Sequence, residues 1–220
     1  MLTILIINKL YILNRKTRYT PSLFYNFYRF SLHFLQNYYM LLNNLKMTKN
    51  NFRRLKLKIA VLSDTHDHFW NTKKAFAQIL DYKISTVIHC GDLISPFMLE
   101  ELEEFPIHIH LIVGNNTGDQ LLLVKKCMER KDQVTLYGWH GYIEIENRKI
   151  AWVHDPFWGK TLAKQNCYDL VCFGHTHRWY LERIKNTLLL NPGEILGRKE
   201  PPGWALIDLK DMDIKRIFLY

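Results

Sequence analysis

Apolar and polar positions form regular blocks from Leu57 to the end of the chain, and these blocks predict strands and helices in turn. Short apolar runs at 57–63 (LKIAVLS) and 85–90 (STVIHC) predict buried strands, whereas 71–82 (NTKKAFAQILDY) has the spacing of a helix. By the same criteria, further strands are expected at 107–115, 133–146, 149–155, 169–177, 187–193, 203–209 and 213–220, and helices at 97–104, 121–130 and 161–167.

The order of these elements predicts an α/β fold. The first half alternates strand and helix, which is typical of parallel strands joined by right-handed crossovers. The second half is mostly strand with tight turns, so a second sheet, mixed or antiparallel, is expected there. Two sheets packed together and flanked by helices would bury the apolar blocks. We expect a single domain over residues 57–220.

Composition separates residues 1–46 from the rest. The chain has 220 residues and a formal net charge of +9, and its 48% hydrophobic content is that of a globular protein. Residues 1–46 hold six Lys and Arg and no Asp or Glu, which leaves +3 for the remainder. The basic balance is therefore weak evidence for nucleic-acid binding. Salt-dependent binding that is lost on removing residues 1–46 would support that hypothesis.

This basic, aromatic-rich extension has several readings. None of its apolar runs reaches the roughly 18–20 residues of a membrane span. It could be an organellar transit peptide or a helix on a membrane surface. We favour a translated upstream segment with Met47 as the true start, so that residues 1–46 are not part of the native protein. The four cysteines form no C-x-x-C pair, and we expect reduced, buried thiols in a cytoplasmic protein.

Polar residues follow five of the predicted strands at the point where each strand ends. Parallel strands bring their carboxyl ends to one edge of a sheet, where ligands bind in α/β folds. Glycines at 91, 114 and 174 suit tight turns there. The side chains concerned are Asp64, His66, Asp92, Asn115, His154, His175 and His177.

Each of these residues also has an ordinary structural reading. Asp64 and Asp92 could cap helices, Asn115 could be a turn residue, and single histidines are usually structural. Five strands ending this way by accident is improbable, so a ligand set is favoured. Oxygen and nitrogen ligands without thiolate suit Mn, Fe, Zn or Mg. Seven side chains suit two ions sharing a carboxylate, which clamp a phosphate and make bound water a hydroxide nucleophile.

The motifs D-x-H, G-D, G-N, a later H and G-H-T-H resemble those of the calcineurin-like metallophosphoesterase superfamily, over about residues 57–220. With NPGE at 191–194, the chain is most similar to the small bacterial and archaeal phosphodiesterases. The resemblance implies a four-layer α/β/β/α sandwich of two mixed sheets flanked by helices. It also implies a metal-dependent phosphoesterase, a hydrolase acting on phosphodiesters.

The resemblance further implies a ligand set for each of two divalent ions. Asp64, His66, Asp92 and His177 would hold one ion. Asp92, Asn115, His154 and His175 would hold the other, with Asp92 as the bridge. Asp92, Asn115 and His154 are the expected catalytic residues. We expect manganese, with iron, zinc, nickel or magnesium as alternatives, a small-molecule or nucleotide phosphodiester as substrate, no transmembrane segment and a homo-oligomer as one option.

The chain departs from the family pattern in two places. Many members have His directly after the G-N asparagine, where it protonates the leaving group, and the small phosphodiesterases typically have G-N-C-D. Here Asn116 and Thr117 stand in these positions, and neither is a useful acid at neutral pH. The usual H-G-H is replaced by His154, Asp155 and Pro156. The alternative function is a non-catalytic interaction scaffold, as in the retromer subunit with this fold, but there the ligand positions are replaced.

Overall fold

The computed structural model describes residues 58–220, so the expectations for residues 1–46 lie outside the described part of the chain. A six-stranded sheet has the strand order β11-β10-β1-β2-β3-β4. Strands β1 to β4 run parallel, and β10 pairs antiparallel with β1 and with β11. The strands are β1 (Lys58–Leu62), β2 (Thr86–His89), β3 (His108–Leu111), β4 (Val134–Leu136), β10 (Gly203–Asp208) and β11 (Asp213–Phe218).

The second sheet has five strands in the order β5-β6-β7-β9-β8. Its inner strands β6, β7 and β9 are parallel, whereas the edge strands β5 and β8 pair antiparallel with their neighbours. The strands are β5 (His140–Ile145), β6 (Arg148–Val153), β7 (Leu170–Cys172), β8 (Trp179–Ile184) and β9 (Thr187–Pro192). Both sheets are therefore mixed, as expected.

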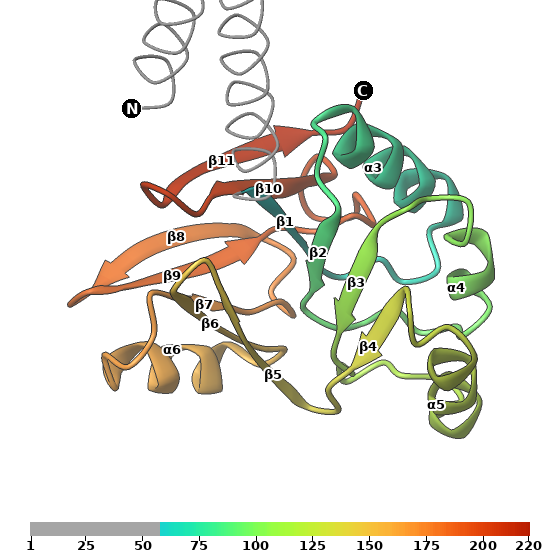
Figure 1. Ribbon diagram of the computed structural model, residues 1–220, viewed down its shortest axis with the longest axis horizontal. Helices are drawn as coiled ribbons and strands as arrows, with labels where there is room; N and C mark the ends of the chain where they lie inside the picture. The colour runs from blue at the N-terminus through green and yellow to red at the C-terminus, as the bar shows by residue number, and fades with distance from the viewer. Residues whose placement is uncertain (1–57) are drawn as a thin grey trace, which may run out of the picture. The chain divides into compact units, whose positions relative to one another are not determined.

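Three separate apolar clusters show that the fold has four layers. One cluster, which includes Phe76 and Trp204, packs the first sheet against α3 (Phe69–Asp81), α4 (Met98–Glu101) and α5 (Gln120–Glu129). A second cluster around Val61 and Trp152 lies between the two sheets. The third packs Ala163 of α6 (Pro156–Lys164) against the outer face of the second sheet. Figure 1 shows α3 to α5 on one side of the paired sheets and α6 on the other.

The fold class predicted from the sequence is confirmed, and two elements differ in detail. Strand β8 was not predicted, and α6 begins at Pro156 rather than near 161 because Asp155 caps it and proline suits the first helical position. Cys90, Cys127 and Cys172 are buried free thiols, but Cys167 is exposed, so burial was wrong for that one cysteine. Within residues 58–220 we find no helix with the length and apolarity that crossing a bilayer requires.

Candidate metal centre

The seven predicted side chains lie at the carboxyl ends of five strands drawn from both sheets. Strands β1, β2 and β3 of the first sheet are followed by Asp64 and His66, by Asp92 and by Asn115, respectively. In the second sheet, His154 directly follows β6, and His175 and His177 follow β7. The two sheets face each other across their shared apolar core, which brings the two sets of loops together.

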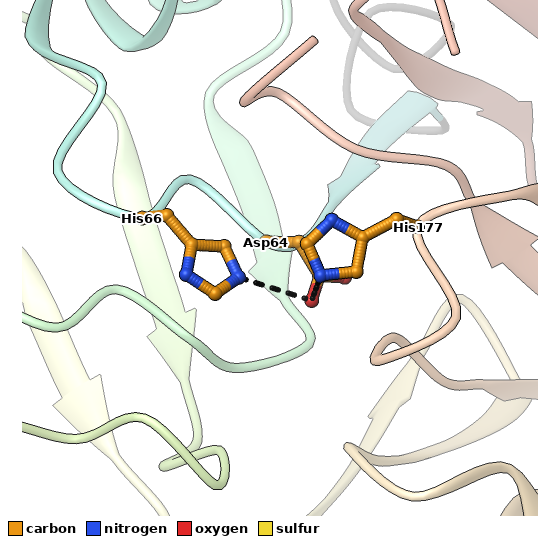
Figure 2. Close-up of side chains that lie close together, drawn as sticks. All are labelled: Asp64, His66 and His177. Atoms are coloured by element: carbon orange, nitrogen blue, oxygen red, sulfur yellow. Dashed lines mark ion pairs between the residues drawn. The ribbon is translucent and has the colours of Figure 1, made fainter. Parts of the chain in front are cut away.

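Asp64 lies at the centre of one group of side chains. Its Oδ1 atom is 3.7 Å from Nε2 of His66 and 3.4 Å from Nε2 of His177. The two imidazole rings are stacked with their centroids 4.9 Å apart. Figure 2 shows these three side chains pointing toward one another from loops that belong to different sheets.

Asp92 connects this group to a second one. Its Oδ2 atom lies 3.3 Å from Nε2 of His66, and its Oδ1 atom lies 3.4 Å from Nε2 of His154. Farther along, Oδ1 of Asn115 is 2.9 Å from Nε2 of His154 and 2.7 Å from Nδ1 of His175. The seven side chains thus form one continuous series of nitrogen–oxygen contacts, with the Asp92 carboxylate in the middle.

Hydrogen bonds outside this series hold three of its members in orientation. Nδ1 of His154 donates to the Cys90 carbonyl over 2.8 Å, and Nδ1 of His177 donates to the fully buried Glu194 carboxylate over 2.6 Å. With Nδ1 donating, the neutral form of each ring presents Nε2 to the site as an acceptor, which is the form a metal ligand needs. Asn116 donates its backbone N–H and its side-chain amide to the two oxygens of Asp92, each over 2.8 Å.

The backbone of the site is strained. A positive φ is uncommon for residues with a side chain and costs about 1–3 kcal/mol each, so it persists where the surrounding structure enforces it, often at functional sites. Five of the seven site residues lie in this left-handed region: Asp64 (54°), His66 (43°), Asp92 (59°), His175 (67°) and His177 (62°).

Two of the predicted glycines are required by close packing at the same place. A Cβ atom on Gly114 would overlap the Asp92 carboxylate, and one on Gly174 would overlap the Ser63 hydroxyl. Both loops therefore approach the site more closely than any other residue type would permit.

The electrostatics of the site favour a cation. Contact with Asp64 raises the pKa of His66, and although burial opposes it, the Asp92 and Asp64 carboxylates raise the pKa of His154. Burial alone would raise the pKa of Asp92, but hydrogen bonds with His154 and Asn116 hold it well below its usual value. The Asp92 carboxylate thus stays ionised, and Asp64 and Asp92 stabilise positive charge at the neighbouring histidines.

Buried polar atoms without hydrogen-bond partners also indicate that the site fits metal ions. Among the buried side-chain atoms of residues 58–220, Oδ1 of Asp64 and Nε2 of His66 have no hydrogen-bond partner, an arrangement that a bound cation would relieve. Two groups of carboxylate and imidazole atoms are close enough to hold an ion. One is Asp64, His66 and His177, and the other is Asp64, Asp92 and His154.

Sequence reasoning missed two residues that orient the site, and it did not predict that two neighbours of the ligands cap helices. Glu194 was seen only within the NPGE motif, and Asn116 only as a missing acid, although each holds a predicted ligand. His68 and Asp155, which flank ligands in the sequence, cap α3 and α6. The cap of α6 could have been read from the Asp-Pro pair, which is a common helix start.

Together, the four-layer sandwich and the Asp, Asn and His side chains at its strand ends define a class of metal-dependent phosphoester hydrolases. A family model for the calcineurin-like phosphoesterase superfamily domain matches residues 57–212. The phosphodiesterase MJ0936 of Methanocaldococcus jannaschii is 32% identical over 166 residues, which span 74% of this chain and 99% of that protein. The chain therefore belongs to the calcineurin-like phosphoesterase superfamily, and it is a metallophosphoesterase.

Solved structures agree with this assignment. The structure of an archaeal phosphodiesterase has a TM-score of 0.69 to this chain at 32% identity, covering 74% of this chain and 99% of the other. Vps29 of Entamoeba histolytica, solved with Zn²⁺, has a TM-score of 0.50 at 18% identity, covering 74% of this chain and 99% of that chain. The second likeness is one of fold alone.

Proposed function

We propose that this protein hydrolyses phosphodiesters with the aid of two divalent ions. Asp64, His66, Asp92 and His177 would hold one ion. Asn115, His154, His175 and again Asp92 would hold the other. The observation that carries the proposal is the position of Asp92, whose two oxygens face His66 and His154 at 3.3 and 3.4 Å. A carboxylate placed in this way can serve both ions.

When bound, two such ions supply charge that neutralises a phosphate and lowers the pKa of a water molecule. The chain's own contribution is orientation. The Cys90 carbonyl and the Glu194 carboxylate fix the rings of His154 and His177, and Asn116 fixes both oxygens of Asp92. Removing one such orienting contact typically lowers metal affinity or activity 10–100-fold.

Two observations narrow the substrate to a diester whose leaving group has a low pKa. MJ0936, which resembles almost the whole domain, is named a phosphodiesterase. Asn116 also leaves the site without a proton donor at the position following the G-N asparagine, so a leaving group of low pKa is favoured. Manganese is the proposed metal because oxygen and imidazole donors without thiolate suit it. Four free cysteines support a cytoplasmic location, and a homo-oligomer stays a prediction.

The test combines metal content with turnover. Wild-type protein saturated with manganese should carry two ions per chain and hydrolyse bis(p-nitrophenyl) phosphate. Asp92→Asn should lose at least one ion and at least about 100-fold in kcat/KM, because it weakens both ions and the contact between them. Asp213→Asn is the matched control, since Asp213 is an exposed residue at the start of the edge strand β11 and every proposed ligand lies at residue 177 or before it.

Two results would contradict the proposal. One ion or fewer per wild-type chain at saturation would exclude the two-ion site. Near-normal turnover by Asp92→Asn with unchanged metal content would exclude Asp92 as the shared ligand.

A further inference from the structure

A cavity of about 630 Å³ opens directly beside the metal centre, a volume typical of small-molecule sites. Asn115, His154 and His175 form part of its wall, so a phosphate at the centre would lie at its mouth. The rest of the wall comes from the second sheet and from α6. The aromatic side chains in that wall are Trp139, Tyr142, Trp158 and Tyr168.

These aromatic residues are unusually accessible for their size. Trp139 is 62% exposed and Trp158 is 58% exposed, although each lines the same cavity. They come from separate parts of the chain, the turn before β5 and the first half of α6. Large apolar side chains left exposed in a concavity indicate a surface that a ligand covers, and indoles are well suited to stack on flat rings.

The charges on the cavity wall further restrict the chemical class of ligand that the cavity can bind. Every lining residue falls in the described part of the chain, and none is Lys or Arg. The only carboxylate in the wall, Asp155, is occupied as the cap of α6, where it accepts from the backbone N–H groups of Phe157 and Trp158. A second phosphate or another strongly anionic group would thus find no Lys or Arg partner there, whereas an uncharged ring would lose little on leaving water.

We propose that this cavity, the aromatic pocket, binds an uncharged aromatic ring system of nucleobase size carried on one arm of the phosphodiester. The substrate class is then a phosphodiester with a nucleoside on the arm that stays attached to the phosphate, rather than one whose arm carries further phosphates. This inference rests on the proposed function, because it requires the phosphate to lie at the metal centre. Trp139 and Trp158 determine specificity by stacking and take no part in the chemistry.

The test compares AMP with ribose 5-phosphate, which differ only in the adenine ring. Calorimetric dissociation constants are measured with the manganese-loaded full chain, as wild type, Trp158→Ala and Trp139→Ala. In the wild type, AMP should bind at least about tenfold more tightly than ribose 5-phosphate, as stacking of one base predicts. The ratio should fall at least about fivefold in each variant.

Trp70→Ala is the matched control, since Trp70 is an equally accessible tryptophan, 71% exposed, that does not line the cavity. It should keep the wild-type ratio. Equal binding of the two ligands by the wild type, or an unchanged ratio in both pocket variants, would overturn the inference. So would an equal fall in Trp70→Ala. Turnover of bis(p-nitrophenyl) phosphate is followed in parallel, and its absence would count against the proposed function alone, since the binding ratio is measured without it.

Discussion

Asn116 combines two properties that decide how the reaction depends on its leaving group. It donates twice to Asp92, and its amide cannot supply a proton at neutral pH. A positioned general acid is typically worth about 10² to 10⁴ in rate, so a site without one depends on the leaving group's own stability.

We therefore predict a steep fall in rate as the pKa of the leaving group rises, with nitrophenyl diesters far ahead of alkyl diesters. Asn116→Ala should lose about tenfold on nitrophenyl diesters, the lower end of the range for an orienting contact, because the backbone hydrogen bond to Asp92 remains. Asn116→His should flatten the dependence if its ring reaches the leaving oxygen. The measurement is kcat/KM over a series of leaving groups.

A rate almost independent of the leaving group's pKa, with chemistry shown to limit it, would mean that another residue provides the proton. Asp155 is exposed and lines the cavity, so Asp155→Asn would be the first variant to examine. His68 is second, although its Nδ1 already accepts the Asn71 backbone N–H.

At this scale the sequence predicts ligands better than their supports. The seven predicted side chains do converge, because each follows an apolar strand and the strand ends meet. Their roles as metal ligands stay a prediction. Glu194 supports His177 from 17 residues away, and its role depends on the path of β8 and β9 between them. The local sequence pattern around Glu194 does not predict the path of these two strands.

Among the elements, the inner strands β1 and β2 of the first sheet were easiest to predict, because they are almost wholly buried and read as short apolar runs. Strand β8 was missed because it is an edge strand, and its WYLERI sequence has exposed polar residues at its centre. The start of α6 was missed because Pro156 and Gly159 read as breakers, whereas the proline occupies the first turn.

The cap of α6 gives a prediction at this scale. Asp155→Ala should lower the free energy of unfolding by about 1 kcal/mol, since two backbone N–H groups lose their acceptor. Asp155→Asn should cost less than half of this, because asparagine caps helices almost as well. Denaturant unfolding of the two variants beside wild type provides the measurement. Equal losses in both would show that the charge of Asp155, and not its capping, is what stabilises the protein.

For the whole molecule, the composition break near Met47 yields a prediction about the shortened chain. All seven proposed ligands follow residue 57, and the family model begins there. A chain of residues 47–220 should therefore keep its manganese-dependent kcat/KM within about twofold of the full chain, the scatter expected of a change remote from a site. Intact-mass measurement of the native protein would show where it starts. A shortened chain that fails to fold or to turn over would show that the first 46 residues are needed.

The division of the ligands between two sheets has a consequence for the protein during its synthesis. Asp64 and His66 follow β1, and one neighbour of β1 is β10, which is formed only by residues 203–208. His177 reaches the site from the other sheet, and its support Glu194 comes later still. A nascent chain thus carries the first ligands long before it can place the last. Hydrolytic competence should appear only near the end of translation, so that unfinished chains are inert toward cellular phosphate esters. Chains released before Gly203 and assayed with manganese should show no turnover, and an active one would contradict this order.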